Sequence, residues 1–85
     1  MIKDKIIELE NGSNYYILED INYNQKKYVL AALCDLENDE IDEDNYIILE
    51  VNVNNNDLFT SHIIDEKTIE TVTKLLIDKV KKDLD

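Results

Sequence analysis

The spacing of the hydrophobic residues changes once along this chain of 85 residues. As far as residue 63 they stand in short runs, rich in β-branched and aromatic side chains, that are separated by polar clusters. From Ile64 onward they recur every three or four residues. The short runs are typical of β-strands, whereas the later spacing is typical of one face of an α-helix. A series of strands followed by a single helix predicts an α+β fold.

Five segments are predicted to be strands, and the polar clusters between them are predicted to be turns. The pair Asn11-Gly12 between the first two segments is a strong hairpin signal. The third segment carries apolar residues on both of its faces, so we expect it to be the central strand. The fourth alternates apolar and polar residues, which indicates one solvated face. These segments are residues 5–10, 15–21, 27–33, 46–53 and 58–63.

The last segment predicts a helix over residues 65–83. Ile69, Val72 and Leu76 share one face of it, and Asp65 stands where a helix-capping residue is expected. Lysines in the last turns suit the negative end of the helix dipole. We therefore expect a single domain over residues 1–85, an antiparallel β-meander of about five strands with one C-terminal amphipathic helix packed on the sheet.

The net charge of −11 comes entirely from the middle of the chain. Residues 28–66 contain eleven acids and no lysine, while both flanking segments are nearly neutral. Seven of these acids fall within ten residues, in a segment that we expect to be an acidic loop over residues 35–45. They are Asp35, Glu37, Asp39, Glu40, Asp42, Glu43 and Asp44.

Such a segment has two interpretations. It is either a solvated loop without a partner or a surface that binds a basic protein. If it were extended, Asp35, Glu37 and Asp39 would project to one side about 6.6 Å apart. A row of anions at this spacing imitates a nucleic-acid backbone and would attract a basic groove. The same charge argues against direct binding of nucleic acid or of an anionic membrane.

We expect no catalytic residues, no metal site and no cofactor. Residues 35–46 fail as a calcium-binding loop, because Glu40 stands where glycine is needed and Tyr46 where a bidentate glutamate is needed. His62 and Cys34 are the only imidazole and thiol, which is too few for a structural zinc site. One glycine cannot form a glycine-rich phosphate loop. Weak divalent-cation binding by the clustered carboxylates stays open as an alternative function.

The compartment expected from the sequence is the cytoplasm. No signal peptide or membrane-spanning segment is recognisable, and a single cysteine cannot form an intramolecular disulfide. The abundance of isoleucine, asparagine and lysine, whose codons are rich in A and T, indicates a low-GC bacterium or its phage. The apolar stripe of the helix is wide enough to predict a homodimer through the helix or a sheet edge.

The order of these features resembles a family of small acidic proteins from low-GC bacteria, domain of unknown function 1292 (YrzB-like). The resemblance covers most of the chain through residues 7–12, 16–21, 27–30 and 44–51, the acidic run, and the capped helix. It implies a small β-rich domain with no established activity. The additional asparagines and the lysine-rich helix end depart from the family pattern, as in a diverged phage or mobile-element copy.

Together these observations predict a non-enzymatic interaction module that presents a carboxylate-rich surface to a basic protein. Its most specific form is a phage-type nucleic-acid mimic that inhibits a nuclease, a CRISPR effector or a DNA-binding protein. The alternatives are an uncharacterised housekeeping bacterial domain with a solvating acidic loop, and a weak divalent-cation binder.

Overall fold

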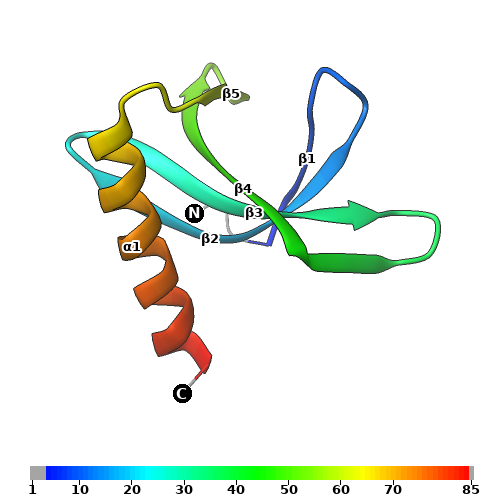
Figure 1. Cartoon of the computed structure of the whole chain (residues 1–85). Helices are drawn as coiled ribbons and strands as arrows, with labels where there is room; N and C mark the ends of the chain where they lie inside the picture. The colour runs from blue at the N-terminus through cyan, green and yellow to red at the C-terminus, as the bar shows by residue number, and fades with distance from the viewer. Residues whose placement is uncertain (1–3, 85) are drawn as a thin grey trace.

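The structure is a computed structural model that describes residues 4–84, except for the side chains of Glu43, Asp83 and Leu84. Five strands form one antiparallel sheet in sequence order, and one helix packs on it (Figure 1). The elements are β1 (Ile6–Glu8), β2 (Asn14–Tyr23), β3 (Lys26–Asp35), β4 (Glu40–Asn54), β5 (Asp57–His62) and α1 (Glu66–Leu84). The predicted α+β meander with a C-terminal helix is confirmed.

The two tightest connections are two-residue hairpin turns. Asn24 and Gln25 join β2 to β3, and Asn55 and Asn56 join β4 to β5. All four residues have positive φ, as a type I′ turn requires at both central positions. The turn at Asn11-Gly12 is confirmed as well. Its loop is longer than two residues, because the amide of Leu9 donates to the carbonyl of Ser13 and residues 10–12 lie between them.

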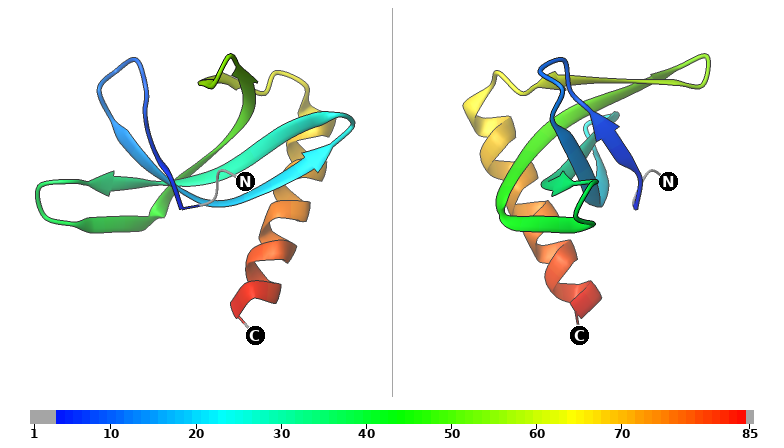
Figure 2. Two further views of the ribbon diagram at one scale, coloured as in Figure 1. Left: turned by 180° about the vertical axis from the view of Figure 1, so that it is seen from behind. Right: turned by 90° about the vertical axis from the view of Figure 1, so that its right-hand side faces the viewer.

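The sheet has a separate hydrophobic core on each face. One contains buried residues of β1, β2, β3 and β4, namely Ile7, Ile17, Val29, Ala31, Leu49 and Val51. Leu9 after β1 and Leu58 in β5 both pack against this core although they lie at opposite edges of the sheet, which requires the sheet to curl (Figure 2). The other core lies under the helix and consists of Tyr28, Leu30, Val72 and Leu76. Since β3 contributes to both, the predicted central strand is confirmed.

A β-bulge at Leu18 changes which face the side chains of β2 point to. Ile17 pairs with Ala31, but the next paired residue is Glu19, opposite Leu30. Ile17 therefore faces the core inside the curl, whereas Leu18 and Ile21 both pack against the core under the helix.

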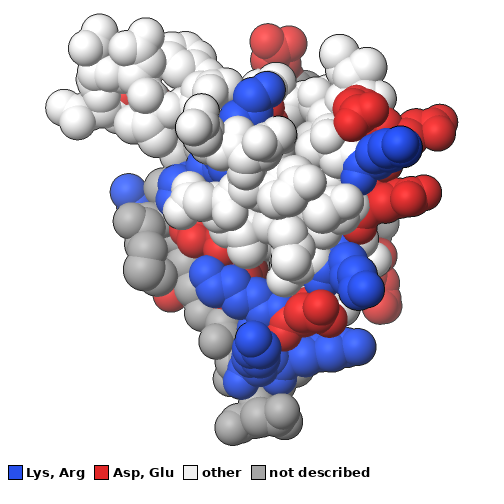
Figure 3. All heavy atoms as spheres, turned by 90° about the vertical axis from the view of Figure 1, so that its left-hand side faces the viewer, with Lys and Arg blue, Asp and Glu red and all other residues white. Residues whose placement is uncertain are grey.

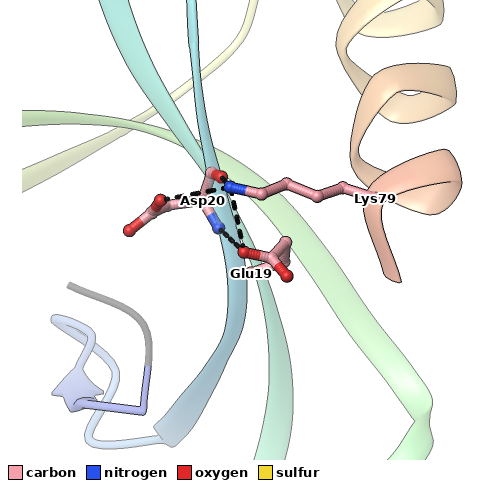
Figure 4. Close-up of polar contacts among 3 residues, drawn as sticks. All are labelled: Glu19, Asp20 and Lys79. Atoms are coloured by element: carbon pink, nitrogen blue, oxygen red, sulfur yellow. Dashed lines mark hydrogen bonds and ion pairs between the residues drawn. The ribbon is translucent and has the colours of Figure 1, made fainter. Parts of the chain in front are cut away.

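The bulge also places two acids in the interior. Glu19 and Asp20 are 1% and 4% exposed. Lys79 reaches them from α1, with its Nζ 3.2 Å from Glu19 Oε1 and donating a 2.7 Å hydrogen bond to the backbone carbonyl of Asp20 (Figure 4). These contacts fix the C-terminal half of the helix to β2.

Candidate functional site: the acidic hairpin

The segment predicted to be an acidic loop over residues 35–45 is mostly strand, so that prediction is wrong. β3 continues to Asp35 and β4 already begins at Glu40, which leaves only residues 36–39 as a turn. The ladder pairs Asp35 with Glu40, Cys34 with Ile41 and Leu33 with Asp42. Backbone pairing thus resumes at Leu33 and Asp42 and continues through the acidic run as far as the turn. We call residues 33–46 the acidic hairpin.

The turn of the acidic hairpin is built by the side chain of Asp35. Its Oδ1 accepts hydrogen bonds from the backbone amides of Glu37 at 3.0 Å and Asn38 at 3.4 Å. The amide nitrogen of the Asn38 side chain donates to Oδ2 at 2.6 Å. Asp39 then adopts a φ of 54°, a left-handed conformation that aspartate tolerates better than most residues. Asp35 therefore shapes the turn as well as adding charge.

A second aspartate turn separates the acidic hairpin from the rest of the sheet. Ala32 pairs with Tyr46 but Leu33 pairs with Asp42, so β4 carries three additional residues at this point. Asp42 holds them, because its Oδ1 accepts the amide of Asp44 at 3.1 Å and its Oδ2 accepts the side chain of Asn45 at 2.7 Å. The irregularity bends β4 where it enters the hairpin, and the hairpin projects away from α1 (Figure 1).

The predicted partner-binding carboxylates are brought together on this hairpin and face solvent. Six of them have exposed side chains, and the side chain of Glu43 lies outside the described part. Asp35, Glu37 and Asp39 do not form the row expected of an extended segment, because the chain turns at residues 36–39. Instead, Asp35 and Glu40 are directly opposite each other on adjacent strands, an unfavourable placement for like charges.

No lysine within the described residues neutralises the acidic hairpin. The described ion pairs join Lys26 to Glu50 and Lys79 to Glu19 and Asp20, all outside this hairpin. Figure 3 shows the helix side of the molecule, where the lysines gather around the C-terminal half of α1. The charges of the two regions are thus separated in space, and the acidic hairpin keeps its negative field.

Hydrogen bonding and burial change the pKa of two groups in this region. The side chain of Asn38 and the amide of Glu37 donate to Asp35 and lower the pKa of its carboxyl group. Asp35 thus stays ionised to a lower pH than an ordinary aspartate does. Burial, followed by the nearby charge of Asp35, raises the pKa of the Cys34 thiol. Cys34 is thereby kept as a neutral thiol, which is a poor nucleophile.

Two exposed hydrophobic residues stand among the carboxylates and were missed by the sequence reasoning. Leu36 and Ile41 are 56% and 44% exposed. Both line a groove of about 820 Å³ whose other side is formed by Gly12 and Ser13 of the β1–β2 loop and by Asn14, the first residue of β2. A signal was available, because these are the only apolar residues between positions 35 and 45. The site is therefore an apolar groove with an acidic rim.

The other residues considered for chemistry are not gathered into a centre. His62 is exposed at the end of β5, while Cys34 is half-buried in β3. Among the described residues, no three histidine, cysteine or acidic side chains are placed to hold a metal ion together. What the acidic hairpin offers chemically is therefore negative charge next to exposed apolar surface.

Comparison of the chain with models of protein families, with curated protein sequences and with solved structures found no match. Within residues 4–84, α1 is too polar to be a membrane-spanning helix. The function therefore has to be argued from the acidic hairpin itself.

Proposed function

We propose that this protein is a non-enzymatic cytoplasmic interaction module whose acidic hairpin binds a basic protein. The observation that carries the proposal is the joint exposure of six described carboxylates and of Leu36 and Ile41 on one projecting hairpin. Exposed apolar side chains add hydrophobic contact area to charge attraction, and this combination is typical of a protein-binding surface.

The negative charge of the hairpin selects the partner. Asp35 and Glu40 repel each other across the strands, and a lysine or arginine between them would remove this repulsion. Its aliphatic stem would pack on Leu36 or Ile41 while its charged group met the carboxylates. The partner surface is therefore basic, with long cationic side chains.

The most specific form of this function is nucleic-acid mimicry. A projecting hairpin with exposed carboxylates on both strands could occupy a groove that normally holds phosphates. An inhibitor of a nuclease, a CRISPR effector or a DNA-binding protein would act in this way. Phage origin of the chain would fit this role.

The test compares the full-length protein with a charge-reversed variant. Glu37→Lys/Glu40→Lys/Asp44→Lys changes three exposed acids and leaves the side chains of Asp35 and Asp42, which shape the backbone, in place. The matched control, Glu8→Lys/Glu10→Lys/Asp57→Lys, makes the same change in net charge at exposed positions elsewhere. Both immobilised variants and the natural protein are exposed to bacterial extract at low and at high salt.

A specific partner is retained by the natural protein and by the control at low salt, is released at high salt, and binds the hairpin variant about a hundredfold more weakly. Equal retention by the hairpin variant contradicts the proposal and leaves the solvating role of a housekeeping domain. If the acidic hairpin mimics nucleic acid, duplex DNA added to the complex with the purified partner displaces that partner from the protein. Cation binding has less support, because no three acidic, histidine or cysteine side chains among the described residues are placed to hold a metal ion together.

A further inference from the structure

The side of α1 that faces β4 is left open. The helix contacts β2 most and β3 less, and it makes few contacts with β4. A hollow of about 380 Å³ remains between the helix and the last two strands. It is lined by Tyr46, Ile47, Ile48, His62, Ile63, Ile69 and Thr73. Because Tyr46 is 49% exposed and Ile69 38% exposed, this apolar surface faces solvent.

The open surface continues along the helix as an apolar stripe. Ile69, Thr73 and Ile77 follow one another at intervals of four residues and therefore lie on one side of α1. Charged residues border the stripe in alternating sign, and they are Glu70, Lys74, Asp78 and Lys81. A stripe with this border can pack against a second helix, and the charges of that helix determine whether it runs parallel or antiparallel to α1.

The charges along the border complement those of a second α1 that runs antiparallel. If the two helices cross near residue 76, Lys74 of each copy lies opposite Asp78 of the other. Glu70 of each copy then lies opposite Lys81 of the other, and Ile77 lies between Thr73 and Ile77 of the second copy. The antiparallel arrangement also brings opposite ends of the two helix dipoles together.

We propose that the protein forms a two-fold symmetric homodimer in which the α1 stripes of two copies pack antiparallel. This inference is independent of the function proposed for the acidic hairpin. The hairpin projects from the molecule away from α1 (Figure 1), so pairing through the helices keeps the two acidic segments of the dimer apart. The same surface pairs with itself, as in most symmetric dimers.

Charge reversal tests the arrangement. Sedimentation equilibrium of the full-length protein gives twice the mass of one chain of 10.0 kDa at high concentration and falls towards one chain on dilution. Glu70→Lys and Lys81→Glu each raise the dissociation constant of the dimer about tenfold, because each places like charges opposite each other. An equimolar mixture of the two variants, and the double variant in one chain, restore the dissociation constant of the natural protein.

The control is Lys82→Glu, which makes the same charge change at the next residue, about 100° further around the helix. It leaves the dissociation constant unchanged, and circular dichroism shows that all variants keep their helix. A mass of one chain at every concentration overturns the proposal. Three other results also overturn it. They are a dimer that both single reversals leave intact, an effect of Lys82→Glu as large as theirs, and a mixture of the two variants that stays monomeric.

Discussion

The ammonium nitrogen of Lys79 on α1 lies 3.2 Å from a carboxylate oxygen of Glu19 on β2, and the Glu19 side chain is only 2% exposed. A second carboxylate, that of Asp20, lies 3.9 Å from the same nitrogen. The second strand and the C-terminal helix are thus joined through charged groups, and the two carboxylates on the β2 side are hardly reached by water. An acid this deeply buried is tolerated only if it keeps its partners.

Replacement of Lys79 by methionine should lower the free energy of unfolding by about 2 kcal/mol, because it removes charge-assisted contacts to buried carboxylates. Methionine retains most of the aliphatic stem, so the loss reports on the charge. Urea denaturation followed by circular dichroism measures it. The control Lys82→Met changes an exposed lysine of the same helix and should have little effect. An equal loss in both variants would show that the buried contacts do not stabilise the fold.

The turn between β2 and β3 should become more stable with glycine. Gln25 has a φ of 67°, where a side chain is unfavourable and glycine is not. We expect Gln25→Gly to raise the free energy of unfolding by about 0.5–1 kcal/mol without changing the denaturant slope. Asn24→Ala, at a φ of 55°, should instead destabilise the protein, since alanine lacks the tolerance of asparagine for this conformation. A loss of stability in Gln25→Gly would contradict the type I′ geometry.

Glu40→Lys should stabilise the acidic hairpin while weakening its binding to a basic partner. The substitution turns the repulsion across from Asp35 into attraction. In thermal melts at low salt, the melting temperature should rise by about 2 °C, and added salt should reduce the gain. Glu8→Lys is a matched control, because Glu8 lies opposite the neutral Asn14. If both substitutions raise the melting temperature equally, the gain reflects net charge and not the pair.

The cap of α1 should make stability depend on pH in acid. The Thr68 side chain and then its backbone amide donate to Asp65 and lower the pKa of its carboxyl group. Because this pKa is lower in the folded state, the Asp65 carboxylate contributes fully to the free energy of unfolding above the unfolded-state pKa of about 3.9. The contribution is lost as the pH falls through the pKa of the folded state. Asp65→Ala should therefore lower the melting temperature at pH 7, and this difference should shrink at acidic pH.

Asp65→Asn is the control for this pH dependence. Asparagine caps helices but does not titrate, so this variant should keep most of the stability at neutral pH. Its melting temperature should fall less steeply with acid than that of the natural protein. A constant difference between the natural protein and Asp65→Ala over the whole pH range would show that the carboxylate is not the origin of the effect.

Local patterns were sufficient to predict the architecture. The change of spacing at Ile64 located the helix within one residue at each end, since α1 begins at Glu66 and Asp65 caps it. The polar turn clusters located three of the four hairpins, and two apolar faces identified β3 as central. These features depend on neighbouring residues, whose influence is visible along the sequence.

Features that depend on distant residues were not predicted. The burial of Glu19 and Asp20 depends on the bulge at Leu18 and on Lys79, which is 59 residues from Asp20. The acidic hairpin was mistaken for a loop because acids are rare in strands, whereas its structure depends on pairing with β3. The exposure of Leu36 in the turn and of Ile41 in β4 likewise follows from the structure of the hairpin and not from the local composition.

The position of β3 between two cores has a consequence for how this sequence can vary in evolution. Val29 and Ala31 pack on one side of the strand while Tyr28 and Leu30 pack on the other, so a larger residue at any of these positions displaces atoms in one of the two cores. The acidic hairpin is attached to the end of the same strand and contacts neither core through its turn. Among related sequences, residues 28–32 should therefore tolerate the smallest range of amino acids. Residues 36–39 should change freely in length and charge, which would allow one scaffold to acquire different partners.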